Sequence, residues 1–139
     1  MPGRFESLEL FYQEVADSKI DHVLCLVSDE EIARKSPTYL EAIRQDRIPA
    51  KLWRHDFPDY GIPEDPDGLK QTLDHIRSRL DDGESVVIHC AAGHGRTGVA
   101  SILLLGRMGM SLQPAFETIH LAGSEPDTPE QRQFLKDQF

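Results

Sequence analysis

The chain has 139 residues, and 15 lysines and arginines against 24 aspartates and glutamates leave it with a formal net charge of −9. That length suits a single compact domain over 1–139, and the negative charge argues against a nucleic-acid or membrane-surface binder, because both polyanions would repel it. Two cysteines, Cys25 and Cys90, are too few for a disulfide scaffold, and without a signal-peptide core or an apolar run of spanning length we expect a soluble cytoplasmic domain.

Hydrophobic spacing in the N-terminal half predicts helices that alternate with short strands. The expected helices cover 6–18, 29–35 and 37–46, and the expected strands cover 22–27 and 50–55. Ser28 is placed to cap the second helix, because its side chain can accept a hydrogen bond from a free backbone N–H group of the first turn. Glu31 stands three residues further on, where a capping box would have its carboxylate return to the backbone of Ser28.

The C-terminal half continues the alternation after a loop over 56–68, which is predicted from five prolines and glycines in that segment. The helices expected after it run from Leu69 to a C-cap at Gly83, over 97–108, near 112–121 and near 128–137, and the clearest strand is 85–89. Strands that alternate with helices predict an α/β fold with a central, largely parallel sheet flanked by helices. In such sheets the functional site lies beyond the carboxyl ends of the strands.

The residues after the strand 85–89 have the composition of an anion-binding loop. They read CAAGHGRTG from Cys90 to Gly98, and a helix is predicted to follow them. Glycines allow a tight turn whose backbone N–H groups converge on one point, and the N-terminal dipole of the helix adds positive potential there. The candidate phosphate-binding residues are therefore those of the loop: Ala91, Ala92, Gly93, His94, Gly95 and Arg96.

Two side chains add chemistry to this loop. Arg96, six positions after Cys90, can turn back and present a planar fork of donors to two phosphate oxygens. A cysteine in so positive a field is expected to be a thiolate near neutral pH, with a pKa of roughly 3.5–7.5. Cys25, by contrast, is expected to fill core space, with a disulfide to Cys90 as the alternative. The loop therefore combines a nucleophile with a receptor for a dianion.

Residues 89–98 resemble the HCxxGxxR[ST]G signature of the cysteine-dependent protein tyrosine and dual-specificity phosphatases. The resemblance implies a compact phosphatase fold and a phosphocysteine intermediate, with Cys90 as the nucleophile and Arg96 as the phosphate ligand. It also implies that Thr97 donates its hydroxyl to the departing sulfur. His89 is expected to order the loop through hydrogen bonds rather than to act as a base.

A second segment, FPDYGIP over 57–63, is similar to the WPDxGxP loop that carries the general acid in the same family, with phenylalanine in place of tryptophan. The resemblance makes Asp59 the expected acid, which must protonate the leaving oxygen as the P–O bond breaks. Asp56 is the reserve candidate. The other acids of the loop that compete for this role are Glu64, Asp65 and Asp67.

Further along the chain, TPEQRQF over 128–134 resembles the glutamine loop of classical tyrosine phosphatases, whose glutamines orient the hydrolytic water. Gln131 matches the second glutamine, which makes it a candidate for positioning water. Asp127 stands where the first glutamine would be. The alternative for Gln131 is an exposed residue in the first turn of the last helix.

These features predict a protein phosphatase that hydrolyses phosphotyrosine, and with it phosphoserine or phosphothreonine, without a metal or other cofactor. The expected partner is a phosphorylated protein, with no nucleic acid or membrane involved and the oligomeric state left open. Ala91 and His94 stand where lysines occupy the HCKAGKGRTG loop of phosphoinositide phosphatases, which argues against a highly phosphorylated lipid as the main substrate. A phosphatase for phosphoinositides or other small phosphomonoesters, and a catalytically weak phosphate-binding module, remain the alternatives.

Overall fold

The computed structural model describes residues 1 to 139 and is built around a three-stranded parallel sheet in the order β2-β1-β3. The strands are β1 (His22–Cys25), β2 (Lys51–Arg54) and β3 (Val86–His89). The central strand β1 pairs with both others, so that Cys25 lies between Arg54 and His89. All three strands therefore end at the same edge of the sheet.

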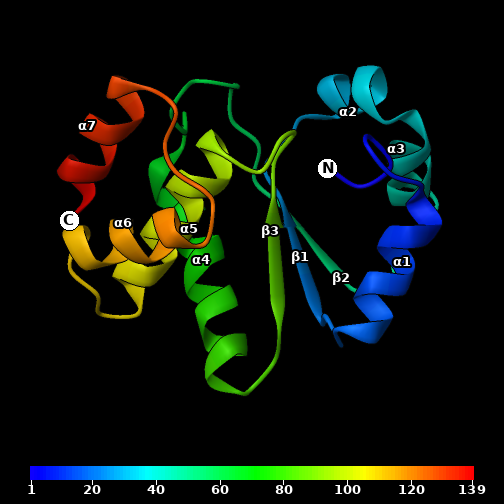
Figure 1. Ribbon diagram of the computed structural model, residues 1–139, viewed down its shortest axis with the longest axis horizontal. Helices are drawn as coiled ribbons and strands as arrows, with labels where there is room; N and C mark the ends of the chain where they lie inside the picture. The colour runs from blue at the N-terminus through cyan, green and yellow to red at the C-terminus, as the bar shows by residue number, and fades with distance from the viewer.

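Seven helices cover the two faces of this sheet (Figure 1). On one face lie α1 (Leu8–Asp17), α2 (Asp29–Lys35) and α3 (Pro37–Arg44), and on the other lie α4 (Pro66–Asp81), α5 (Gly95–Arg107), α6 (Leu112–Leu121) and α7 (Pro129–Gln138). This arrangement confirms the predicted α/β fold with a parallel sheet flanked by helices. No helix is at once long enough and apolar enough to cross a membrane.

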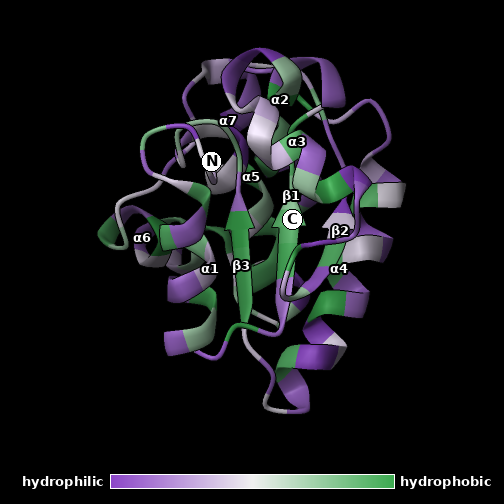
Figure 2. Cartoon of the chain, turned by 90° about the vertical axis from the view of Figure 1, so that its right-hand side faces the viewer, coloured by the Kyte–Doolittle hydropathy of each residue, from purple (hydrophilic) through white to green (hydrophobic).

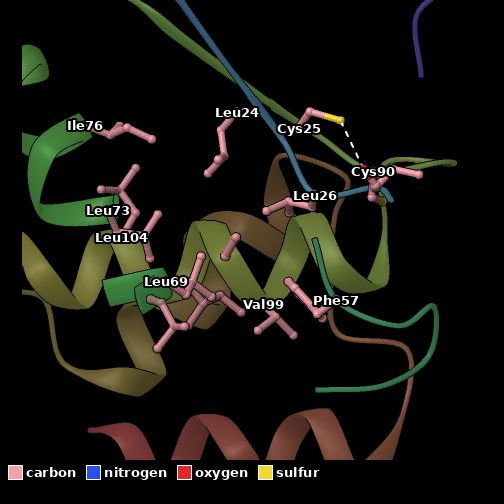
Figure 3. Close-up of a cluster of buried hydrophobic side chains, with 14 of the residues drawn as sticks. Leu24, Cys25, Leu26, Phe57, Leu69, Leu73, Ile76, Cys90, Val99 and Leu104 are labelled. Atoms are coloured by element: carbon pink, nitrogen blue, oxygen red, sulfur yellow. Dashed lines mark hydrogen bonds between the residues drawn. The ribbon is translucent and has the colours of Figure 1, made fainter. Parts of the chain in front are cut away.

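Burial of β1 and α5 holds the helical layers on the sheet. Val23, Leu24 and Cys25 expose no surface, as expected for a central parallel strand covered on both faces. Nine of the 13 residues of α5 are buried, and this helix packs against β3, α4, α6 and α7. Apolar residues follow the strands in Figure 2, and Figure 3 shows side chains of the sheet, α4 and α5 in one cluster. Each buried leucine of such a cluster stabilises the fold by about 1.5–3 kcal/mol.

All the predicted helices and strands are present, with boundaries that shift by up to three residues from the sequence-based expectation. The strand predicted over 22–27 ends at Cys25, and the chain leaves the sheet with its next two residues still buried. Helix α4 begins at Pro66, inside the predicted loop. It starts there because Asp65 accepts a hydrogen bond from the Gly68 N–H over 3.0 Å, and because proline suits the first helical position.

Candidate active site

The loop expected to bind an anion connects the carboxyl end of β3 to α5. It reverses direction at Gly93, whose φ of +85° lies in the region that favours glycine. Helix α5 begins at Gly95, two residues before the predicted start, so Arg96 lies in its first turn. The positive end of the helix dipole is therefore directed at the loop. A cavity of about 230 Å³ opens at this point, and Cys90 lies in its wall.

The predicted phosphate-binding residues all lie at this loop. Four of them line the cavity together with Cys90: Ala91, Ala92, His94 and Gly95. Gly93 instead makes the turn, and its N–H donates to the Cys90 sulfur over 3.3 Å. Arg96 lines a second, neighbouring cavity of about 320 Å³.

Cys90 is held in a position that favours its thiolate, although only 4% of its surface is exposed. Burial raises the pKa of the thiol, but hydrogen bonds from Thr97 and from the backbone N–H groups of Gly93 and Ala92 outweigh burial and lower that pKa below its ordinary value. The Thr97 hydroxyl is buried beside the sulfur without a partner in standard hydrogen-bond geometry. Among the contributions that lower the pKa, that of the Thr97 hydroxyl is the largest, followed by those of the backbone N–H groups of Thr97, Gly93 and Ala92.

Cys25, the other cysteine, belongs to the apolar core cluster. Its side chain is fully buried and donates a weak hydrogen bond to the Val27 carbonyl over 3.7 Å. Burial raises the pKa of the Cys25 thiol, which is the opposite of the shift at Cys90. Both cysteines are free, so the chain holds one activated and one inert thiol.

Arg96 is almost completely enclosed, with 2% of its surface exposed. Its Nη1 and Nη2 atoms donate to the two carboxylate oxygens of Glu31 over 2.9 and 3.3 Å, and Nη1 also donates to the Phe57 carbonyl over 3.3 Å. Its Nε–H group is buried and has no acceptor. A buried donor of this kind costs about 1–3 kcal/mol unless it is paired, so the guanidinium retains a donor that an anionic ligand can accept from.

Glu31 is a site residue that the sequence did not reveal. The predicted capping box is only half present: Ser28 Oγ accepts from the Glu31 N–H over 3.3 Å, but the carboxylate binds Arg96 and Lys35 instead of the backbone of Ser28. Burial raises the pKa of Glu31, and the hydrogen bonds from Arg96 and Lys35 more than reverse this effect. The carboxylate therefore stays ionised and fixes the orientation of the guanidinium.

The loop over 57–63 places Asp59 next to the anion-binding loop. Phe57 is 4% exposed and anchors the start of this segment in the core. The Asp59 carboxylate lies 3.3 Å from Arg96 Nη2 and accepts a hydrogen bond from the Tyr60 N–H over 3.2 Å. Its side chain is 39% exposed, so it is open to a leaving group as well as to solvent.

Asp59 is better placed than the other acids of this segment. It lines both the cavity that holds Cys90 and the neighbouring one, whereas Asp56 and Glu64 line only the neighbouring one. Asp65 accepts a hydrogen bond at the start of α4, and Asp67 pairs with a lysine on the surface of the same helix. The geometry therefore favours Asp59 among the candidate acids.

A third segment, residues 124–131, supports the anion-binding loop from behind. Ser124 Oγ donates to the Gly93 carbonyl over 2.8 Å, and an Asp127 carboxylate oxygen accepts from the Gly95 N–H over 3.0 Å. Gln131 is fully buried rather than exposed: its Oε1 accepts from the Asp127 N–H over 2.8 Å, and its Nε2 donates to the Gly61 carbonyl over 2.9 Å. Its amide thus links the segment to the loop that carries Asp59.

His89 orders the anion-binding loop from the end of β3. Its Nδ1 donates to the Cys90 carbonyl over 3.0 Å, and this tautomer leaves Nε2 to accept from the Tyr39 hydroxyl over 2.8 Å. Burial is the main reason that the pKa of His89 falls from 6.5 to about 4. A neutral imidazole with both nitrogens engaged fits a structural role.

The lowered pKa of His89 predicts a loss of stability in mild acid. The unfolded chain takes up the proton near pH 6.5 and the folded chain only near pH 4, so the free energy of unfolding should fall as the pH drops through that interval. The expected loss is about 3 kcal/mol, and urea unfolding at a series of pH values would measure it. His89→Gln should be less stable near neutral pH but should lack most of this slope. The same slope in both proteins would contradict the assignment.

A protein-family model described as PTP-SAK, "Swiss Army Knife protein, DSP-PTPase phosphatase domain", matches residues 8–137. Tyrosine-protein phosphatase 1 of Caenorhabditis elegans is 42% identical to the chain over 48 residues, which are 34% of this chain and 5% of that protein. Tyrosine-protein phosphatase non-receptor type 4 of Homo sapiens is 35% identical over 69 residues, which are 49% of this chain and 8% of that protein. The matched region is therefore a small part of these relatives.

Solved structures share the fold over almost the whole chain. The crystal structure of kinase associated phosphatase with its catalytic-site cysteine replaced by serine superposes with a TM-score of 0.80 at 18% identity, covering 97% of this chain and 80% of that chain. The crystal structure of Tk-PTP in the active form gives a TM-score of 0.70 at 26% identity, covering 91% of this chain and 84% of that chain. The first likeness concerns the fold alone, because its identity is low.

Proposed function

The chain belongs to the PTP-SAK family of DSP-PTPase phosphatase domains, and on this premise we propose that residues 1–139 act as one domain that hydrolyses phosphotyrosine in proteins, with phosphoserine and phosphothreonine as further substrates. One observation carries the proposal. Cys90, whose thiol has a lowered pKa, shares a cavity with Asp59, whose carboxylate lies 3.3 Å from the guanidinium of Arg96. These residues supply a nucleophile and an acid in one cavity and an anion receptor in the adjoining one, with Asp59 lining both.

In the first step the Cys90 thiolate attacks phosphorus in line. A sulfur–phosphorus bond forms while the bond from phosphorus to the leaving oxygen breaks, and Asp59 gives its proton to that oxygen. Arg96 and the free backbone N–H groups of residues 91–96 stabilise the charge on the three equatorial oxygens. The Gly95 N–H is shared with Asp127, so the remaining N–H groups and the guanidinium carry most of this task.

In the second step water cleaves the phosphocysteine. Asp59, now a carboxylate, takes a proton from the water, whose oxygen bonds to phosphorus as the sulfur leaves as a thiolate. Thr97 is the group that eases this departure, because its hydroxyl is buried beside Cys90. The role of Gln131 in placing the water stays a prediction. Both ends of its amide already bind backbone groups of Gly61 and Asp127, so the side chain would have to release one of them to hold a water. A reducing compartment such as the cytoplasm, which keeps Cys90 as a thiol, is part of the proposal.

The test is turnover of p-nitrophenyl phosphate across pH 5–8 in reducing buffer, with inhibition by vanadate. Phosphotyrosine and phosphothreonine peptides and a phosphoinositide, assayed at equal concentration, then rank the substrate classes. We expect turnover of the aryl phosphate and the fastest hydrolysis with the phosphotyrosine peptide. Phosphate binding without turnover would favour the catalytically weak binding module, and fastest hydrolysis of the phosphoinositide would favour the lipid alternative.

A further inference from the structure

The cavity around Cys90 has walls of opposite charge. Arg4 and Lys35 line one part of it, and Asp59 and Asp127 line another. Figure 1 shows the N-terminal segment beside α2, at the edge of the sheet where the strands end. The anion-binding loop over 90–96, from here on the phosphate loop, contributes no lysine. The cations that line this cavity therefore come from the N-terminal segment and from α2.

Arg4 is held at the cavity by two contacts of its own side chain and by the anchoring of the segment before it. Its Nη1 donates to the Ala91 carbonyl of the phosphate loop over 3.1 Å, and its guanidinium lies 4.5 Å from the centre of the Phe5 ring. The segment before it is tied to the start of α3, because Ser36 Oγ donates to the Pro2 carbonyl over 2.8 Å. Arg4 forms no ion pair, so its charge and most of its five N–H donors are available to a ligand.

Lys35 is the second cation, and its charge is only partly compensated. Its Nζ lies 2.9 Å from Glu31 Oε1, but the same carboxylate also binds Arg96. Glu31 thus divides its charge between Lys35 and Arg96, and Asp59 adds a second carboxylate on the Arg96 side only. The Lys35 side chain is 25% exposed, against 10% for Glu31, so the lysine faces the solvent side of this group.

We propose that Arg4 and Lys35 form a subsite for a second negative charge, so that the domain prefers phosphopeptides with an acidic residue on one side of the phosphorylated residue. The inference rests on the proposed phosphatase function. A peptide fits better than an anionic membrane surface, because the neighbouring cavity is lined by the carboxylates of Asp56, Asp59 and Glu64, with Arg34 as its one exposed cation. A membrane would meet both charged walls, whereas a peptide can place its acid against the cations alone.

The experiment compares kcat/KM for three phosphotyrosine peptides of equal length, with glutamates only before the phosphotyrosine, only after it, or absent. The wild-type domain should prefer one of the two acidic peptides over the neutral one, and added salt should reduce this preference. Arg4→Gln and Lys35→Gln should each lower the acidic-to-neutral ratio about fivefold, which corresponds to about 1 kcal/mol per lost ion pair. Arg4→Lys keeps the charge and should retain the ratio. The matched control Arg79→Gln removes an exposed cation at the far end of α4 and should leave the ratio unchanged.

Because the acidic-to-neutral ratio of kcat/KM is measured within each variant, a variant that is partly unfolded or slower on all substrates keeps the same ratio. Equal rates on all three peptides in the wild type would overturn the subsite, as would an unchanged ratio in the Arg4→Gln, Lys35→Gln double variant. A fall in phosphoinositide hydrolysis with an unchanged peptide ratio would overturn it in favour of a lipid ligand. Turnover of p-nitrophenyl phosphate distinguishes a failure of the subsite from a failure of the proposed phosphatase function. If the wild-type domain does not hydrolyse this ester, the phosphatase function itself is wrong.

Discussion

Replacing Cys90 with serine is expected to abolish turnover of p-nitrophenyl phosphate while leaving the binding of inorganic phosphate largely intact. A serine hydroxyl does not ionise near neutral pH, whereas the hydrogen bonds that lower the pKa of the Cys90 thiol supply the nucleophile in its reactive form. The Gly93 N–H, which donates to the sulfur over 3.3 Å, keeps an acceptor in the variant, so the loop keeps its shape. Steady-state kinetics and calorimetric titration with phosphate measure the two properties separately.

Cys25→Ser is the matched control for this variant. The Cys25 thiol is buried in the core and its pKa is raised, so it lacks the reactivity of a nucleophile. The control should lose stability, because a hydroxyl is placed in an apolar cluster, and should still turn over substrate. Wild-type activity in Cys90→Ser would show that the phosphocysteine mechanism is wrong. Loss of activity in a folded Cys25→Ser protein would mean that both thiols take part in the reaction.

Asp59→Asn is expected to lower the rate by roughly 10²–10⁴ for substrates with poor leaving groups. Asparagine has the shape of aspartate and can still accept the Tyr60 N–H bond, but it has no acidic proton to give to the leaving oxygen. Phenyl phosphate should therefore lose far more rate than p-nitrophenyl phosphate, whose leaving group departs without protonation. Parallel kinetics on the two esters measure this difference.

Asp56→Asn tests the alternative acid on the same pair of esters. Asp56 lines only the cavity next to the one that holds Cys90, so its removal should change both rates little. Equal losses on both esters in Asp59→Asn would indicate a role in placing Arg96 rather than in proton transfer, since the two side chains lie 3.3 Å apart. A leaving-group dependence that appears only in Asp56→Asn would transfer the acid role to that residue.

The parts of the site that the sequence predicts are those encoded within short segments. Residues 85–108 combine a run of β-branched residues, a glycine-rich turn and an apolar helix, and each of these depends on neighbouring residues alone. The structure accordingly places the loop between β3 and α5 with Cys90 in the cavity. The helix begins two residues earlier than expected because the turn ends at Gly93 and Arg96 is already held by Glu31.

The contacts that complete the site join residues far apart in the chain, and no local sequence pattern predicts them. Glu31 has the spacing of a capping box, but 65 positions separate it from the arginine that binds its carboxylate. For Gln131 the sequence favours a role in placing water or an exposed position, yet the residue is buried and its amide satisfies two backbone groups. No local pattern predicts the contact of Ser124 with the Gly93 carbonyl, because a serine in a loop can reach many different carbonyls. Tertiary packing decides these contacts.

The buried amide of Gln131 couples the loops of the site in local unfolding. It joins the Gly61 carbonyl of the acid loop to the Asp127 N–H, and Asp127 and Ser124 in turn hold the phosphate loop. Segments joined by buried hydrogen bonds open together rather than one by one. We therefore expect the acid loop (57–63), the support segment (124–131) and the phosphate loop (90–96) to open as one cooperative unit, so that an anion bound to the phosphate loop slows hydrogen exchange and proteolysis in the acid loop.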